Sequence, residues 1–238
     1  LMRMFSNRSF SSSISSPGCR AKPMLGPKWI TSMLRNVMSR IAGARLTKDT
    51  ASADVVMHCE DATVTPNQPP LRLKRGARLI NFGCSDVSKS RSTAAFEAAF
   101  GYELAVDPTT HVGPAVEKSE INGAHDGRVV DCPAHKLPGR AYQRLVDNRG
   151  ADARMVEDLR TCLVAGGPIC VFVKRRPSEK RFQNTNSEVL LRTPEEIFSA
   201  VEIASIAAFA RELGLDWGAI DILRDRGDGL LYIFYANK

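Results

Sequence analysis

The chain has 238 residues and a 43% hydrophobic content, which is typical of a globular protein with one large domain or two small ones. Its longest apolar runs, such as Ile203 to Ala210, are far shorter than the roughly 20 residues of a bilayer-spanning helix, which excludes a transmembrane helix. The net charge of +7 comes from residues 1–46, which hold eight basic and no acidic residues; the other 25 Lys and Arg face 26 Asp and Glu, which argues against a nucleic-acid-binding body.

The first 22 residues are rich in Ser and Arg and contain no acid, which is the composition of an organelle transit segment. This composition predicts a mitochondrial protein. The alternatives, for a cytoplasmic protein, are a disordered tail or translated upstream sequence before a start at Met24, since the chain begins with Leu. Contact with RNA through the basic leader, residues 1–46, is a further hypothesis that rests on charge alone.

Residues 29–43 predict an amphipathic helix, because apolar pairs recur every four positions from Trp29 and Ile30 onward. Such a helix can lie on a membrane surface, dock on a partner or pack on its own domain. The leader therefore also supports a partner hypothesis, in which it attaches the protein to a larger organellar assembly.

The body alternates strand and helix signals, which predicts an α+β fold. Two helices are expected, Lys89–Phe100 with Ser88 as N-cap, and Pro194–Leu213, which Gly214 ends. The expected strands are short and rich in apolar, branched side chains, and they run over 53–60, 115–119, 128–132, 141–146, 155–164 and 169–175. The six cysteines are scattered without metal-ligand spacing, which indicates reduced thiols of an intracellular or organellar protein.

The last 26 residues predict a hairpin of two strands, 219–224 and 231–236, joined by a charged, glycine-containing turn. Asp221 lies on the first strand and Asn237 at the end of the second. A hairpin sets these oxygen-bearing side chains side by side, and paired oxygens suit a hard divalent cation that also holds phosphate. The alternative is an ordinary hairpin with exposed polar ends.

Two further segments carry features of phosphate binding. Lys118 precedes a loop with Gly123 and Gly127, and such a loop lets a backbone approach phosphate while the lysine adds a charge. Lys174, Arg176 and their basic neighbours end a later strand, where they would neutralise an anionic substrate. The alternatives are a hairpin turn and a solvated strand edge. No nucleophile motif such as GxSxG is present, so acyl-enzyme chemistry has no support.

Taken in order, these motifs resemble an ATP-grasp domain. The segments are Lys118 with its glycine loop, residues 142–148 (YQRLVDN), the basic strand end at 174–176 and the final hairpin. The resemblance covers roughly residues 53–238, and its best part is the hairpin, where the family has an Asp on one strand and a carboxylate-x-Asn on the next. It implies a two-lobed α+β fold with mixed or antiparallel sheets, preceded here by a basic extension, that clasps ATP and uses it with Mg²⁺ to phosphorylate a carboxylate.

The resemblance also implies roles for single residues. Several would contact the nucleotide: Lys118, Gly123 and Gly127 at the glycine loop, Gln143, Arg144 and Leu145 on the hinge strand beside adenine, and Asp158 and Lys174 on later strands. Arg176 would meet phosphate or substrate, and Arg224 would orient the site. Asp221 and Asn237 would hold Mg²⁺.

Two departures from the family pattern bear on catalysis. Tyr235 stands where a bridging carboxylate is expected, and a neutral phenol weakens the binding of a second magnesium ion. The chain also ends at Lys238, where the family continues with a loop that helps build the acceptor site, so a C-terminally truncated domain is expected. The sequence therefore predicts an ATP-binding, ligase-like protein of unknown substrate with impaired or lost catalysis, or alternatively a non-catalytic ATP-grasp-derived subunit of an organellar complex.

Overall fold

A computed structural model of the chain describes residues 5–6, 45–47, 49–58, 62–65, 71–124, 126–150, 153–183 and 185–238. They form two compact units: unit 1 is Leu1–Asp61 with Asn67–Ile80, and unit 2 is Ala62–Pro66 with Asn81–Lys238. The predicted start of the body, Ala53, falls within unit 1. The amphipathic helix expected over 29–43 lies outside the described residues.

Unit 1 contains a small sheet of four short strands in the order β2-β1-β3-β4. The strands are β1 (Phe5–Ser6), β2 (Arg45–Leu46), β3 (Val55–Met57) and β4 (Arg78–Ile80). Strand β1 runs antiparallel to β2 and β3, whereas β3 and β4 are parallel. Strand β3 is the middle of the strand predicted over 53–60. Strand β4 is too short for its sequence to show an alternating pattern.

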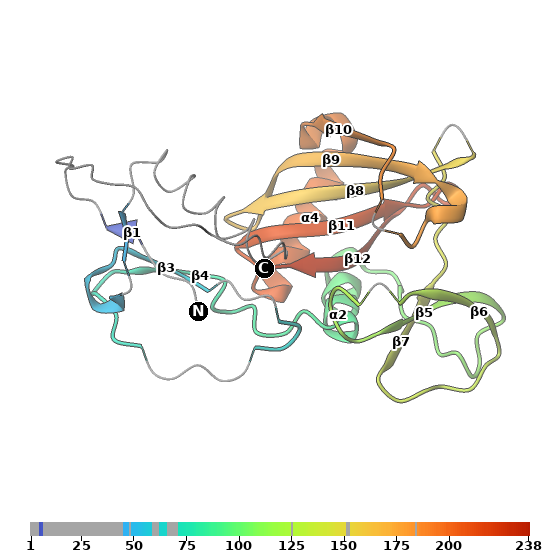
Figure 1. Cartoon of the computed structure of the whole chain (residues 1–238), viewed down its shortest axis with the longest axis horizontal. Coiled ribbons are helices and arrows are strands. Elements are labelled where there is room, and N and C mark those ends of the chain that lie inside the picture. The colour runs from blue at the N-terminus through green and yellow to red at the C-terminus, as the bar shows by residue number, and fades with distance from the viewer. Residues whose placement is uncertain are drawn as a thin grey trace, which may run out of the picture. The chain divides into compact units, whose positions relative to one another are not determined.

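The centre of unit 2 is a five-stranded antiparallel sheet in the order β10-β9-β8-β11-β12 (Figure 1). Its strands are β8 (Met155–Val164), β9 (Gly167–Pro177), β10 (Glu188–Arg192), β11 (Trp217–Arg224) and β12 (Leu231–Asn237). The hairpin predicted at the C-terminus is therefore β11–β12. A bulge adds one residue to β12, because Asp221 pairs with Tyr235 and Ile222 with Ile233.

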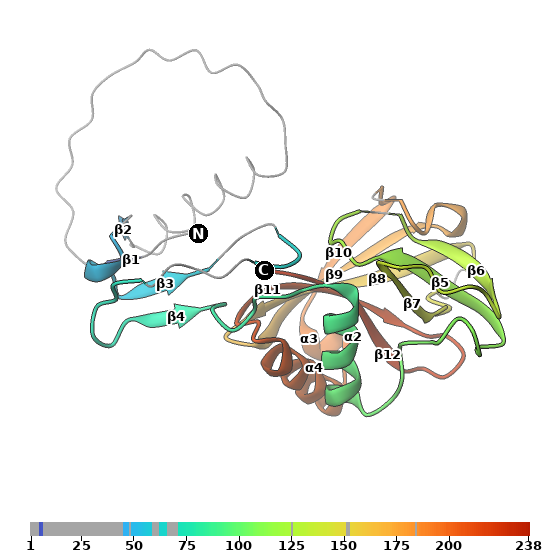
Figure 2. The ribbon, with the colours of Figure 1, turned by 90° about the horizontal axis from the view of Figure 1, so that it is seen from below.

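Helices cover one face of this sheet and bury the core of unit 2. They are α2 (Lys89–Phe100), α3 (Pro194–Ile197) and α4 (Ala200–Leu213); α2 contacts α4 and β12, and α4 contacts β9 (Figure 2). Phe209 of α4 and Ile220 of β11 are both completely buried there. The single helix predicted over 194–213 is thus two helices, because Phe198 is extended and Ser199 caps α4 by accepting from the Glu202 amide.

A second, three-stranded sheet of unit 2 has the order β6-β5-β7, with β5 antiparallel to both neighbours. Its strands are β5 (Gly113–Ser119), β6 (Arg128–Cys132) and β7 (Arg140–Arg144). The glycine loop, residues 120–127, joins β5 to β6. The predicted α+β class with mixed and antiparallel sheets is confirmed. In the part of the chain that the structure describes, no helix is long and apolar enough to cross a membrane.

Candidate functional site

Polar side chains gather on the face of the five-stranded sheet that the helices leave uncovered. Successive strand residues point to opposite faces, so the buried Leu159 and Ile220 face the helices while Asp158, Arg160 and Asp221 face the other way. The register sets Arg160 beside Asp221, and it sets Asp158 beside Lys174. Three strands thus bring opposite charges together on one face.

Asp221 lies between two cations. One terminal nitrogen of Arg160 donates to both of its carboxylate oxygens, at 3.2 and 3.1 Å. The Lys174 ammonium lies 3.8 Å from the same carboxylate. Burial lowers the pKa of Lys174, and the charge of Asp221 partly offsets this effect.

Asp158 anchors a second group of contacts on this face. Its carboxylate accepts from the guanidinium of Arg176, which is buried, and from the side-chain amide of Asn148 at 3.1 Å. The oxygen of Asn148 in turn accepts from Arg181 at 3.0 Å. Burial raises the pKa of Asp158, and the neighbouring Arg176 opposes the rise.

Lys118, on the three-stranded sheet, joins the same group of charges. Its ammonium lies 4.1 Å from the centre of the Phe234 ring, which is a cation–π contact with β12. Burial lowers the pKa of Lys118 to about 7, and the charges of Lys89 and Arg181 lower it while those of Asp158 and Asp221 raise it. Lys118 therefore shares its surroundings with the carboxylates of the five-stranded sheet.

The glycine loop approaches Lys118 and the end of β12. A β-carbon on Gly127 would lie 3.6 Å from the side chain of Lys118, and one on Gly123 would lie 3.7 Å from the Tyr235 hydroxyl. Gly123 has φ +74, a conformation that glycine adopts without steric cost. The loop thus keeps its backbone close to Lys118 and to the end of β12.

Lys89, at the start of α2, extends the group toward the C-terminus of the chain. Its ammonium donates to the side-chain oxygen of Asn122 at 3.0 Å and lies 4.7 Å from the centre of the Tyr235 ring. The amide of Asn122 donates to the Ala236 carbonyl at 3.0 Å and lies 3.4 Å from the oxygen of Asn237. Asn237 is therefore oriented by the glycine loop.

Together these residues form what we call the basic cluster. It contains six cations and three carboxylates, which leaves an excess of three positive charges when every cation is protonated: Lys89, Lys118, Arg160, Lys174, Arg176 and Arg181, with Glu120, Asp158 and Asp221. Two acids at its edge have cationic partners of their own, since Asp126 pairs with Arg140 and Asp147 with Arg149. A surface of this charge fits an anion with several negative groups, such as a polyphosphate.

The donor set does not fit a magnesium ion. Both oxygens of Asp221 already bond Arg160, the oxygen of Asn237 faces the amide of Asn122, and Tyr235 lies opposite Asp221 in the register. Within the described residues, no group of three or more His, Cys, Asp and Glu side chains is placed to hold a metal. Mg²⁺ prefers several oxygen ligands at short range, and here cations occupy that place.

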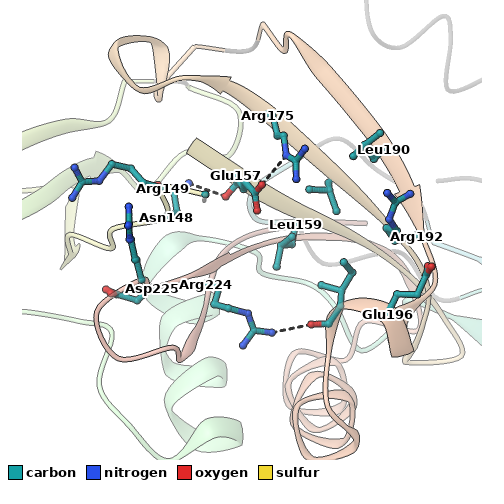
Figure 3. Close-up of a pocket in the computed structure, with 14 residues that line it drawn as sticks. Asn148, Arg149, Glu157, Leu159, Arg175, Leu190, Arg192, Glu196, Arg224 and Asp225 are labelled. Carbon is teal, nitrogen blue, oxygen red and sulfur yellow. Dashed lines mark hydrogen bonds and ion pairs between the residues drawn. The ribbon is translucent and has the colours of Figure 1, made fainter. Parts of the chain in front are cut away.

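The structure separates Arg224 from the other predicted site residues. Three positions separate it from Asp221 on β11, and this odd number places it on the helix-covered face. There its guanidinium donates to Glu202 at 2.6 Å and to the Ile197 carbonyl at 2.9 Å. A pocket of about 460 Å³ lies on that face, with Arg175, Arg192 and Arg224 in its lining (Figure 3).

The predicted hinge residues are placed in different ways. Gln143 is buried on β7 and its amide donates to Thr93 of α2 at 2.8 Å, so its side chain serves the core. Arg144 pairs with Asp228 at 2.9 Å, and Leu145 directly follows β7. The next residue, Val146, reaches the basic cluster, because its carbonyl accepts from Arg181 at 2.8 Å.

The sequence missed three members of this site: Lys89, Arg160 and Asn148. Lys89 is the first residue of a predicted helix, and Arg160 lies in a predicted strand. Secondary structure alone therefore accounts for both residues in the sequence, and neither stands out as a site residue. The one available signal was the alternation of Asp158 and Arg160 with apolar residues along β8. It shows that they share a face but not which cations and acids they meet.

Solved structures similar to this chain are ATP-grasp ligases, the family that its motifs resemble. They include PsnB complexed with precursor peptide PsnA2 and AMPPNP (TM-score 0.47, 16% identity, covering 68% of this chain and 53% of that chain). The L-amino acid ligase from Bacillus licheniformis has a TM-score of 0.44 and 12% identity, and the match covers 65% of this chain and 40% of that chain. The D-alanine–D-alanine ligase from Bacillus anthracis complexed with ATP has a TM-score of 0.40 and 15% identity, and the match covers 63% of this chain and 52% of that chain. The chain thus spans about half the length of these proteins or less. No family model and no curated protein matches it.

Proposed function

We propose that unit 2 is an ATP-grasp-like domain that binds the polyphosphate of a nucleotide such as ATP on the basic cluster, beneath the glycine loop. By its resemblance to the family it is a carboxylate ligase of unnamed substrate in which turnover is impaired or lost. One observation carries the proposal: Arg160, Lys174 and Arg176 of the five-stranded sheet pair with Asp158 and Asp221, and Lys118 of the three-stranded sheet contacts the Phe234 ring of the same five-stranded sheet.

The cluster has the physical properties that polyphosphate binding requires. Guanidinium groups bond phosphate oxygens with two donors at once, and Arg160 on β8 presents such a group. The buried Arg176 on β9 adds its charge, while its guanidinium donates to Asp158, Asn186 and the Arg181 carbonyl. Lys118 and Lys174 add compact charges from opposite sheets. The glycine loop next to Lys118 is exposed at Gly123, where its backbone is accessible to a ligand.

Loss of turnover is supported by the end of β12. Tyr235 stands opposite Asp221, where the family pattern has a carboxylate, and a phenol is neutral near pH 7. Without a carboxylate there, the site lacks a ligand that would hold the metal for phosphoryl transfer.

Titration of ATP into the full chain, followed by calorimetry, tests the proposal. We expect binding, and we expect Lys118→Ala to weaken it about tenfold or more, since a partly buried charge facing phosphate is lost. Lys136→Ala is the matched control, because it makes the same substitution at an exposed lysine, on the loop between β6 and β7.

The same samples are assayed for ADP after addition of mixed amino acids, with circular dichroism to confirm folding. The expected result is ATP binding with ADP at the buffer background. Absence of binding at millimolar ATP, or equal loss in Lys118→Ala and Lys136→Ala, would contradict nucleotide binding at this site. Steady ADP formation would contradict the loss of turnover.

A further inference from the structure

The carboxylate of Asp221 forms ion pairs with protein cations, and these cations occupy the positions that a metal ion would need. Arg160 reaches both of its oxygens at 3.1 to 3.2 Å, and Lys174 stands 3.8 Å away. The side chains of Asp221 and Arg160 are each about one quarter exposed, so solvent screens this pair only in part. A magnesium ion at Asp221 would have to displace or repel both cations.

The second predicted metal ligand is also engaged. The oxygen of Asn237 lies 3.4 Å from the amide nitrogen of Asn122, and Asn122 is held by Lys89 at 3.0 Å. Lys89 thus places another positive charge near the place where a metal would sit. The Asn122 amide donates both to the Ala236 carbonyl and to the oxygen of Asn237, so this oxygen accepts from a protein donor.

The basic cluster carries a net positive charge, which suits a polyphosphate without a metal better than its magnesium complex. Six cations against three carboxylates leave three positive charges. The triphosphate of free ATP carries about four negative charges near neutral pH, since the terminal phosphate holds up to two and each of the other two phosphates holds one. A triphosphate bound to Mg²⁺ carries two fewer and is a poorer partner for this surface.

We infer that the site binds metal-free polyphosphates: the protein's own guanidinium and ammonium groups supply the neutralisation that Mg²⁺ gives elsewhere, and Asp221 is an internal counterion that competes with the ligand for Arg160 and Lys174. The inference rests on the proposed function and deepens it. The ligand class is a free nucleoside triphosphate or an inorganic triphosphate.

Binding to the full chain is measured by calorimetry with ATP in excess EDTA, with ATP in excess MgCl₂, with inorganic triphosphate in EDTA and with AMP in EDTA. We expect ATP in EDTA to bind about fivefold tighter than the magnesium complex, because the full charge of the ligand is available. Inorganic triphosphate is expected to bind in EDTA, and AMP to bind at least about tenfold more weakly than ATP.

The variant Asp221→Asn separates the two roles of this residue by the sign of its effect. If Asp221 competes with the ligand, its neutralisation frees Arg160 and Lys174 and tightens ATP binding in EDTA about fivefold. If Asp221 holds magnesium, the same variant instead weakens the binding of ATP in excess MgCl₂. Asp131→Asn is the matched control, because Asp131 is exposed on β6 and carries the same charge.

Three outcomes overturn the inference. The first is that the unaltered chain binds ATP only when MgCl₂ is present. This result overturns the inference even if Asp221→Asn fails to fold. The second is that folded Asp221→Asn binds ATP more weakly than the unaltered chain does, in EDTA or in MgCl₂. Absence of binding for every form of ATP overturns the proposed function and this inference together, whereas binding that needs magnesium leaves the proposed function standing.

Discussion

The ammonium of Lys118 shows how the fold changes the chemistry of a single residue. Burial lowers its pKa from 10.5 to about 7, and the nearby Lys89 adds to this effect. The Phe234 ring and the acids Asp158 and Asp221 stabilise the charged form in part. A buried lysine with a lowered pKa is typical of an anion-binding site, because a bound phosphate would stabilise the charged form of the lysine.

This lysine makes the stability of the protein depend on pH. Between pH 7 and 10.5 the folded state binds fewer protons than the unfolded state, so the free energy of unfolding rises with pH across that window. The cost of the buried charge is fully present below about pH 7. We therefore expect Lys118→Met to be more stable than the unaltered chain at pH 6 by about 2 kcal/mol; the full shift corresponds to about 5 kcal/mol, which partial exposure reduces.

Urea denaturation from pH 6 to pH 9.5 measures this difference. The gap between Lys118→Met and the unaltered chain is expected to narrow as the pH rises, because Lys118 loses its charge in the folded state. Lys136→Met provides the comparison, and its stability should follow that of the unaltered chain at every pH. A gap that stays constant or widens with pH would show that Lys118 titrates normally.

At the scale of elements, most boundaries in unit 2 follow from local patterns. Helix α2 and strands β6 and β8 have the bounds that the sequence predicts, since caps, turns and alternation all agree there. The break between α3 and α4 was missed, although Ser199 and Glu202 carry the spacing of a capping box. The long-range pairing of the strands could not be predicted, because it depends on residues far apart in the chain.

Gly214 illustrates what a local pattern can and cannot give. The sequence identifies it as the end of a helix, and it has φ +70 after α4. Its second role comes from packing: a β-carbon there would lie 2.5 Å from the carbonyl carbon of Gly83 and 2.7 Å from its oxygen. This approach joins α4 to the segment before α2 and has no signal in the sequence.

A pair of glycine variants separates these two roles. Gly139 also has φ +70, but a β-carbon there meets nothing within 4 Å. We expect Gly139→Ala to lower the free energy of unfolding by about 1 kcal/mol, the cost of the left-handed conformation. Gly214→Ala should lower it by about 4 kcal/mol, because the backbone around Gly83 must also move.

Urea denaturation of the two glycine variants gives both values under the same conditions. Equal losses would mean that the segment around Gly83 moves aside without cost. A loss in Gly139→Ala as large as the one expected for Gly214→Ala would instead indicate that the turn before β7 is under constraint.

At the scale of the whole molecule, the candidate site depends on how the two sheets of unit 2 meet. Lys118, Lys174 and Asp221 were predicted from motifs in the expected order, and the structure brings them together. Arg160 and Lys89 could not be predicted, since their partners are set by the register of β8 with β11 and by the position of α2. The motifs therefore identify the face, and tertiary packing decides its charge.

This arrangement predicts where a ligand will slow hydrogen exchange. A polyphosphate bound by Lys118 on one sheet and by Lys174 on the other links both sheets, so ATP in EDTA should slow exchange in β5 as well as in β8 and β9. At a ligand concentration of about 100 times Kd, the gain is about 2.7 kcal/mol, or roughly 100-fold for amides that exchange through unfolding of unit 2. Strands β3 and β4 of unit 1 should exchange at unchanged rates.

Mass spectrometry of the full chain, with and without ATP, resolves these segments. In Lys118→Ala, the slowing at β5 should fall more than the slowing at β9, because only the five-stranded sheet keeps its contacts with phosphate. Lys136→Ala should retain the pattern of the unaltered chain. Slowing confined to β8, β9 and β11 in the unaltered chain would show that the ligand binds one sheet alone, and slowing of β3 and β4 would place it in unit 1; either result contradicts a site shared by Lys118 and Lys174.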